Sequence, residues 1–242
     1  MPTQSRFQRF IILALLTGFI GSFIGLITPL VVEARPLGRP KGMSKTGSVR
    51  GGCPAIDTNL ENRKLMALVD SSDPTLTTQL RPTFWVYMPF SRTEDITIAE
   101  FELFDENMNP VLANNKIAIS LPIKAGLARF TLPAHEQPLA AGKEYFWVFR
   151  VVCDEVDRSG NPSVSGWIKR ISPAVSLVQR LKAVPKVDQY KVYAENNIWF
   201  DQIDLLAQNS ARHNQEWTKL LASFGLRSFA QQTVIDLEAN TQ

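Results

Sequence analysis

The feature that most restricts the fold of this 242-residue chain is a series of short segments rich in β-branched and aromatic residues between residues 65 and 171. Turn-forming residues separate the segments at intervals of roughly 8 to 15 positions, a spacing typical of antiparallel β-sandwiches. The sequence therefore predicts a mainly β domain of the immunoglobulin-like or fibronectin-like type over residues 54–171. The seven expected strands cover residues 65–69, 83–88, 97–104, 111–120, 127–132, 144–153 and 163–171.

Tyr145 begins the most informative of these segments. It closes a Leu-x-x-Gly-x-x-Tyr pattern over residues 139–145, which resembles the tyrosine corner of such sandwiches, where the phenol hydroxyl bonds to upstream backbone. From Tyr145 onward every second residue is apolar, and this alternation predicts that Trp147 and its same-face neighbours point into the core. Trp85 and Trp167, on other expected strands, are expected to be core neighbours.

After residue 171 the hydrophobic period lengthens towards that of a helix, which indicates a helical region over residues 172–242. Ser172 and Pro173 are expected to start the first helix, with Ser as N-cap and Pro at the first helical position. Gly225 is expected to end the last helix. We expect a small helical hairpin packed on the sandwich; the alternative is a tetratricopeptide-like unit, of which no second copy is visible.

Three aromatic residues of this helical region form the candidate partner surface. Tyr193, Trp199 and Phe200 lie close in sequence around the expected turn between two helices. A short helical appendage buries aromatic side chains only against the sandwich or against another chain. These residues are therefore the candidate contact surface for a protein partner.

Residues 1–34 have the layout of a secretory signal peptide. Arg6 and Arg9 form a positive n-region, no side chain from residue 10 to residue 32 is charged, and Val32 and Ala34 supply the small residues of a cleavage site. We therefore expect cleavage after Ala34 and a mature protein that works in the periplasm or outside the cell. The alternative is an uncleaved membrane anchor, because roughly 20 apolar residues suffice to cross a bilayer.

A basic segment follows at residues 35–53. It has five basic side chains, no acidic side chain and no aromatic residue, which predicts a flexible linker that cannot bury a core. Such a segment is usually a solvated spacer, although it could also contact anionic phospholipid beside the apolar N-terminal stretch. The formal net charge of the chain is only +3, which argues against a nucleic-acid partner.

Cys53 and Cys153 are the two cysteines of the chain. In an oxidising compartment an even pair is best interpreted as a disulfide, so the sequence predicts a bridge between them. A redox pair and half of a zinc site with His135 and His213 are the alternatives. Both are weak, because the sequence has no C-x-x-C motif and the four residues lack local ligand spacing.

Several sequence blocks are shared with one known family. They cover residues 50–53, 65–69, 81–87, 145–149, 153–154, 157–159, 166–170, 193–195 and 198–200, and the aromatic and cysteine-containing blocks are the most specific. In these blocks the chain resembles the cyanobacterial family called domain of unknown function 928. The resemblance implies an exported cyanobacterial protein and carries no activity and no catalytic residue.

Recognisable catalytic patterns are absent from the sequence. There is no Gly-x-Ser-x-Gly or Ser-x-x-Lys motif, no phosphate-binding glycine loop and no His-Glu-x-x-His zinc helix. His135, in a proline-rich loop, and His213, between expected helices, are both expected to be exposed polar residues. We therefore expect no catalytic residue, no cofactor and no enzymatic activity.

The acidic turn after the strand expected at residues 144–153 is the one candidate metal site. Asp154, Asp157 and Ser159 could offer oxygen ligands to calcium, although the pattern is not that of an EF-hand. A solvated turn in which Arg158 pairs with a neighbouring acid is the more ordinary interpretation, so no metal is predicted. The same carboxylates would suit glycosidic hydrolysis if they were held roughly 5 to 9 Å apart.

These observations favour an exported, non-enzymatic envelope protein that acts as a protein–protein interaction or assembly module. The expected partner is another envelope protein. Two alternatives stay open: a glycan-active hydrolase or carbohydrate-binding protein, and a membrane-anchored periplasmic sensor or scaffold.

Overall fold

The computed structural model describes residue 53 and residues 64–240. The chain divides into two compact units, Met1–Arg35 and Pro36–Gln242, and all described residues belong to the second. The predicted signal peptide at residues 1–34 and the predicted linker at 35–53, apart from Cys53, lie outside the described residues. Within the described residues, no helix has the length and apolar character that a bilayer crossing requires.

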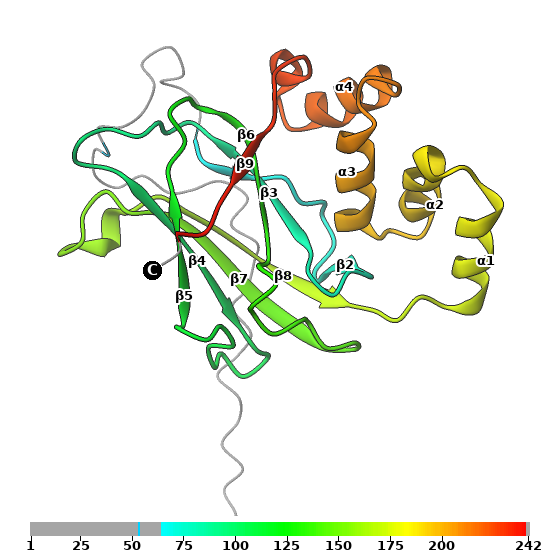
Figure 1. Cartoon of the computed structure of the whole chain (residues 1–242), viewed down its shortest axis with the longest axis horizontal. Helices are drawn as coiled ribbons and strands as arrows, with labels where there is room; N and C mark the ends of the chain where they lie inside the picture. The colour runs from blue at the N-terminus through cyan, green and yellow to red at the C-terminus, as the bar shows by residue number, and fades with distance from the viewer. Residues whose placement is uncertain (1–52, 54–63, 241–242) are drawn as a thin grey trace, which may run out of the picture. The chain divides into compact units, whose positions relative to one another are not determined.

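Nine strands and four α-helices make up the described part of the chain (Figure 1). The strands are β1 (Met66–Ala67), β2 (Thr75–Thr77), β3 (Thr83–Met88), β4 (Ile98–Phe104), β5 (Lys116–Ser120), β6 (Gly126–Thr131), β7 (Glu144–Val151), β8 (Ser163–Arg170) and β9 (Ile235–Leu237). The helices are α1 (Val175–Ala183), α2 (Gln189–Glu195), α3 (Trp199–Gln208) and α4 (Asn214–Ser223). Three short 3₁₀ turns, at Arg158–Gly160, Lys186–Asp188 and Arg227–Phe229, connect some of them.

The strands form two sheets, a four-stranded sheet in the order β1-β3-β6-β9 and a five-stranded sheet in the order β2-β8-β7-β4-β5. Most neighbouring strands are antiparallel, but β2 runs parallel to β8 and β9 runs parallel to β6. The prediction of a mainly β fold with C-terminal helices is confirmed, whereas the prediction of purely antiparallel sheets is wrong. The two parallel strands are three residues long, too short for a hydrophobic alternation to reveal them.

The seven expected strands are present, although several are shorter than predicted, most clearly β1, which has only two residues, and β5. β5 begins at Lys116, five residues after the expected start at 111, because the intervening residues form a turn. In this turn Asn115 has a φ of 62°, a left-handed conformation that Asn tolerates better than most residues.

The main core lies between the two sheets. Phe84 of β3 is central to it, with ring centroids 4.6 Å from Phe101 and 5.3 Å from Trp147. Alternate residues of β7 from Trp147 to Val151 are buried in this cluster, which confirms the predicted inward face of that strand. The hydroxyl of Tyr145 accepts a hydrogen bond from the Ala140 N–H at 3.0 Å, the upstream bond expected of a tyrosine corner.

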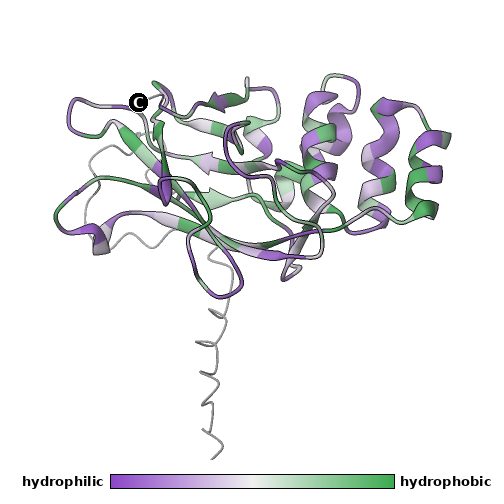
Figure 2. Ribbon diagram, turned by 60° about the horizontal axis from the view of Figure 1, so that its bottom comes forward, coloured by the Kyte–Doolittle hydropathy of each residue, from purple (hydrophilic) through white to green (hydrophobic). Residues whose placement is uncertain are grey.

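A second core joins the outer face of the four-stranded sheet to α3 and α4. Trp85 packs edge-on against Trp217 at 5.9 Å, and Tyr87 packs against Phe229 at 4.9 Å. The helices show both hydrophilic and hydrophobic residues along their length, as amphipathic helices do (Figure 2). The helical region is therefore a third layer that shares a core with the sheet.

Trp167 is buried in neither of these two cores. Its ring lies 5.3 Å from Phe146, in a separate cluster on the other face of the five-stranded sheet. The prediction that Trp85 and Trp167 are core neighbours is therefore wrong, although both side chains are buried. The physical reason is the period of two in a strand, which turns Trp85 away from Phe84 and towards the helices.

The first helix starts later than the sequence indicates. α1 begins at Val175 with Ala174 as N-cap, and no side chain caps it, so the predicted start at Ser172 and Pro173 is wrong. Ser172 and Pro173 instead belong to the extended segment between β8 and the helix. The other end of the helical region agrees with the prediction, because Gly225 has a φ of 70° directly after α4 and its C-cap.

Cys53 and Cys153 form a disulfide, with their Cα atoms 5.5 Å apart, which confirms the predicted bridge. Cys53 is buried in the core between the sheets, and Cys153 follows the end of β7. The bridge closes a sequence separation of 100 residues. It therefore restricts the unfolded chain strongly.

Replacement of Cys53 and Cys153 by serine should lower the free energy of unfolding by about 4 to 5 kcal/mol, the chain-entropy value for a loop of about 100 residues. Urea denaturation of the variant and of the oxidised parent measures this difference. Reduced parent protein is the matched control, because it lacks the bond but keeps both sulfur atoms. A loss of stability below about 1 kcal/mol in both samples would contradict the prediction.

Truncation after Ile171 should prevent stable folding, because it removes the helices that bury Trp85, Tyr87 and Leu127 and also removes β9. Thermal unfolding and binding of a hydrophobic dye test this. The control is Val175→Ala in the full chain, since Val175 is 75% exposed and its loss should change stability little. A truncated protein with an unchanged melting temperature would show that the helices are dispensable.

Candidate functional site

Side chains of α3 cover one end of each sheet. Trp199 donates from Nε1 to the Leu68 carbonyl beside β1 at 2.8 Å. Asp201, which is 2% exposed, accepts from Thr77 Oγ1 at 2.8 Å and from the Thr78 N–H at 3.0 Å at the end of β2. These contacts protect two edge strands, which would otherwise offer backbone groups to other chains.

These contacts also change the interpretation of the predicted partner surface. Tyr193 is 8% exposed and Phe200 is 3% exposed, and the Phe200 ring lies 5.5 Å from Phe84 in the core. The Trp199 ring packs on Phe224 at 6.0 Å. Tyr193 and Phe200 therefore cannot form an exposed partner surface, because the chain buries them itself. The aromatic pattern in the sequence alone does not distinguish burial within the chain from exposure to a partner.

β5 is the edge strand of the five-stranded sheet on the side opposite β2. Among the described residues, only part of the outer edge of β5 has a partner. The Asn240 N–H donates to the Ala118 carbonyl at 2.8 Å, and Ala239 forms a single bridge with Ile119. In an antiparallel ladder, a residue directs its N–H and C=O to the same side, and successive residues alternate. The N–H of Ala118 and both backbone groups of Lys116 therefore face this edge, where no residue of the described chain bonds to them.

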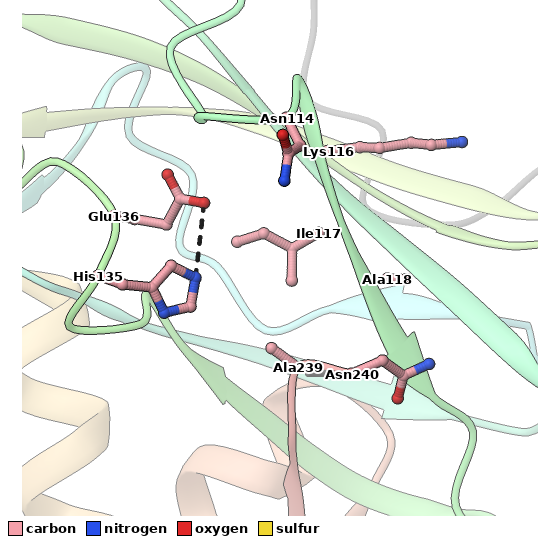
Figure 3. Close-up of a pocket in the computed structure, with 8 residues that line it drawn as sticks. All are labelled: Asn114, Lys116, Ile117, Ala118, His135, Glu136, Ala239 and Asn240. Atoms are coloured by element: carbon pink, nitrogen blue, oxygen red, sulfur yellow. Dashed lines mark ion pairs between the residues drawn. The ribbon is translucent and has the colours of Figure 1, made fainter. Parts of the chain in front are cut away.

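A pocket of about 570 Å³ opens beside these backbone groups (Figure 3). Three segments far apart in sequence form it: β5 with the turn before it, the loop between β6 and β7, and the residues after β9. The lining residues are Asn114, Lys116, Ile117, Ala118, His135, Glu136, Ala239 and Asn240. A concave site with an apolar wall and a few polar groups has the general character of a binding site.

Glu136 is a buried acidic residue of the pocket, only 5% exposed. Its Oε2 accepts from the Ala113 N–H at 3.0 Å. Its Oε1 lies 3.8 Å from Nε2 of His135, which is too long for a hydrogen bond. Figure 3 shows both side chains directed towards the pocket.

Arg81 holds the loop that carries Glu136. Its guanidinium donates to the carbonyls of Pro133, Ala134 and Glu136 at 2.9 to 3.2 Å. These bonds reach backbone oxygens, so the guanidinium positions the loop without bonding to the carboxylate. The loop is thereby held in one conformation before any ligand binds.

Lys116 points away from the pocket, as Figure 3 shows. Its ammonium binds Glu100 Oε1 at 2.6 Å, and Arg158 binds the other oxygen of the same carboxylate. Glu100, buried on the sheet, is thus paired with two cations. Arg158 therefore pairs with an acid of β4 that is 58 residues away in sequence, and not with a neighbouring acid of its own turn as predicted.

The acidic turn uses its carboxylates locally. Asp154 Oδ1 accepts from the N–H groups of Val156 and Asp157, and Asp157 Oδ1 accepts from the N–H and hydroxyl of Ser159. The bonds from Ser159 lower the pKa of Asp157. Within the described residues, no group of three or more His, Cys, Asp or Glu side chains is placed to hold a metal ion. Neither aspartate lines the pocket beside β5.

The two histidines differ in exposure. The side chain of His135 is 69% exposed, in agreement with the sequence prediction. His213 is 8% exposed, and its ring packs against Tyr190 at 4.9 Å, so the prediction that it is exposed is wrong. It directly precedes α4, and the Tyr190 ring of α2 packs against it.

A charged cluster joins α3, β6 and β9. Arg129 binds Asp236 and lies 3.9 Å from Asp204, and its guanidinium stands 5.7 Å from the centre of the Trp85 ring. The hydrogen bond to Asp236 raises the pKa of Arg129. Burial raises the pKa of Asp204, and the charge of Arg129 opposes this effect. Because the members pair with one another across three elements, the cluster connects the helical layer to the sheet.

The fold defines a class: a mainly β protein of two mixed sheets with a C-terminal helical layer. The family comparison narrows this class. The profile described as Domain of Unknown Function (DUF928) matches residues 45–234, and the chain belongs to this family. Searches of the curated proteins and of the solved structures each find no match.

Sequence reasoning missed Asn114, Glu136, Ala239 and Asn240 as site residues. No motif connects them, since they come from three distant segments. One signal was available at Glu136, an acidic residue in a proline-flanked loop between two strands. A polar loop of this composition is usually exposed to solvent, so nothing in the sequence indicated burial.

Proposed function

We propose that this protein is an exported, non-enzymatic interaction module that binds an extended segment of a partner protein along the edge of β5. The observation that carries the proposal is that both backbone groups of Lys116 and the N–H of Ala118 have no partner among the described residues beside the pocket, although Asn240 binds the Ala118 carbonyl. Addition of a strand to an exposed sheet edge is a common mode of peptide recognition, in which backbone bonds give affinity and pockets give specificity.

The treatment of two of the three other sheet edges supports this proposal, and β9 is the remaining edge strand. Trp199 and Asp201 cover the edges at β1 and β2, and such coverage is how proteins avoid uncontrolled pairing. β5 has five residues, and among the described residues only Ala239 and Asn240 pair with its outer edge, next to a pocket that can hold a side chain. Among the described residues, those that line the pocket include no Ser, Thr or Cys nucleophile, and this supports binding rather than catalysis.

The proposal includes an immunoglobulin-like or fibronectin-like origin of the sandwich. The orders β1-β3-β6 and β8-β7-β4-β5 correspond to strands A-B-E and G-F-C-C′ of that architecture. The bond from the Ala140 N–H to the Tyr145 hydroxyl supports the same assignment. Strands β2 and β9 are then additions at the sheet edges.

Export rests on the N-terminal pattern and on the disulfide. The charged and apolar layout of residues 1–34 is that of a translocation signal, and disulfides persist mainly in oxidising compartments. The proposed location is the periplasm or the cell exterior of a cyanobacterium, and the proposed partner is another envelope protein. No nucleic acid, metal or cofactor takes part in this function.

Ala118→Pro should abolish strand addition, because it removes the N–H that faces the open edge while the bonds to β4 are kept. The probe is a neutral eight-residue peptide of alternating threonine and valine at millimolar concentration. Amide hydrogen exchange, read by NMR, should slow at Lys116 and Ala118 in the parent protein when the peptide is added. In the proline variant the exchange at Lys116 should not respond.

Ala118→Val is the matched control, since it changes the side chain but keeps the N–H, and it should bind like the parent. An unchanged exchange rate at Lys116 in the parent, at saturating peptide, would reject the edge as a binding site. Equal binding by the proline variant would show that the peptide binds elsewhere.

Expression with the native N-terminus should give a mature protein that begins at Arg35, because signal peptidase cleaves after small residues such as Ala34. N-terminal sequencing of protein from the periplasmic fraction measures this. The control is Ala34→Leu, which should block cleavage and leave the protein with the membrane. A chain that keeps residues 1–34 in the parent would favour the membrane-anchored alternative.

A further inference from the structure

We infer that a second pocket, formed by α4 and the turn after it, binds an acidic sugar through Lys219 and Arg227. The ligand class is a sugar unit that carries a carboxylate or a sulfate group. This pocket shares no lining residue with the pocket beside β5, so the inference goes beyond the proposed function and does not depend on it.

The pocket has a volume of about 640 Å³ and lies between one face of α4 and the turn that follows the helix. Four of its residues have the i, i+3, i+4, i+7 spacing that places side chains on one helix face. The chain then reverses at Gly225, which has a φ of 70°, and the Leu226 N–H donates to the Leu221 carbonyl at 2.8 Å. This reversal returns Arg227 to the side of α4. The lining residues are Asn214, Gln215, Thr218, Lys219, Ala222 and Arg227.

Two cations of the pocket have no acidic partner. The side chains of Lys219 and Arg227 are exposed, and in the described part of the chain neither forms an ion pair or a hydrogen bond. Between residues 205 and 234 the sequence has three basic side chains, and Glu216, which does not line the pocket, is the one acid. Two uncompensated cations in one concave site attract an anionic group.

The backbone that carries these cations is held by the second core. Leu226 and Phe229, on either side of Arg227, are 1% and 4% exposed, and Trp217, two residues before Lys219, is 2% exposed. The two cations therefore extend from rigid elements, and binding does not have to order the backbone first.

Neutral polar side chains make up most of the remaining wall. Asn214 Oδ1 accepts from Thr218 Oγ1 and from Gln231 Nε2, each at 3.0 Å, so the orientation of this amide is fixed. The Nδ2 group of Asn214 and the side-chain amide of Gln215 form no hydrogen bond within the described residues. Amide groups both donate and accept, as the hydroxyl groups of a sugar do.

The size and chemistry of the pocket together favour a sugar. Its volume of about 640 Å³ lies within the range of roughly 300 to 1,000 Å³ that small-molecule sites have. Ala222 is the smallest side chain of the lining and leaves room on the helix face for a ring. A sugar acid offers hydroxyl groups to the amides and an anionic group to the two cations, and so satisfies both kinds of lining residue.

Two other anionic partners fit the pocket less well. A protein partner is usually anchored by aromatic or aliphatic side chains in apolar pockets, whereas Ala222 is the one apolar residue in the described lining. A helix that lies on an anionic membrane inserts large apolar side chains. The large hydrophobic residues that the described chain exposes are Leu80, Ile123, Val156 and Val175, and none belongs to α4 or to the turn after it.

The test titrates the exported protein with two trisaccharides by isothermal calorimetry at constant ionic strength. One is trigalacturonate, which carries carboxylates, and the other is galactotriose, which is neutral. Trigalacturonate should bind at least about tenfold more tightly, because hydrogen bonds between charged groups contribute more than neutral ones. Raising the salt concentration should reduce this preference, since both cations are exposed to solvent.

Lys219→Gln and Arg227→Gln should each weaken the binding of trigalacturonate at least about fivefold, because each removes one charge-assisted contact. Lys182→Gln is the matched control, since it removes the same charge from an exposed position of α1 outside the pocket, and it should bind like the parent.

Ala222→Leu tests the pocket itself, because it fills the space beside the cations without changing the charge. It should weaken binding about as much as the charge variants do. Ala183→Leu is the matched control, the same change at an exposed position of α1. Thermal unfolding shows whether each variant is folded, and the comparison of the two trisaccharides on the parent protein needs no variant.

Three outcomes would overturn the inference. The first is equal binding, or no binding, of the two trisaccharides. The second is binding of trigalacturonate that Lys219→Gln, Arg227→Gln and Ala222→Leu all leave unchanged, which would place the sugar elsewhere. The third is equally tight binding of an eight-residue peptide of alternating glutamate and threonine, which would show that the pocket selects charge without selecting a sugar. Ala118→Pro should leave sugar binding unchanged, so failure here does not touch the proposed strand addition at β5.

Discussion

Strand β3 has a hydrophobic side chain at every position after Thr83, so both of its faces need to be covered. Phe84, Val86 and Met88 fill the space between the sheets, and Trp85 and Tyr87 need a second layer on the other side. A simple two-layer sandwich would leave those two aromatic residues in water. The helices after β8 supply the missing layer, and their position follows from this requirement.

The same requirement explains what α3 does. To cover Trp85, the helix runs over the four-stranded sheet with Ile203 and Leu206 facing it. Its first turn then reaches the ends of β1 and β2, where Trp199 and Asp201 bind backbone groups. One helix thus buries a sheet face and closes two edges. β5 lies beyond its reach, which leaves that edge to the loop and the chain segment that form the pocket.

Much of the fold could be predicted from the sequence, because local patterns determine it. The alternation after Tyr145 indicated the inward face of β7, and Gly225 indicated the end of the last helix correctly. The cysteine pair also followed from chain composition and compartment. The face of the sheet on which Trp167 lies could not be predicted. The alternation of residues in a strand shows that the strand has two faces, but it does not show which part of the chain covers each face.

The pocket beside β5 could not be predicted for a different reason. It depends on the return of the chain after β9 to a strand more than a hundred residues earlier, and no local signal reports that contact. The prediction of a partner surface at Tyr193 and Phe200 was wrong for the same reason, because no local signal in the sequence reports the tertiary contacts of these residues. Aromatic residues at helical spacing indicate burial, and only the tertiary structure shows that the chain itself provides the cover.

The pairing of β9 with β6 also has a consequence for the order in which the molecule forms. Ile235 pairs with Ala128, so the four-stranded sheet gains this strand only after the ribosome has added more than a hundred residues beyond β6. Contacts between residues so distant in sequence form slowly, because a long loop has to close first. The four-stranded sheet therefore stays incomplete until β9 has been made, and an incompletely folded chain is one that can still pass through a narrow channel.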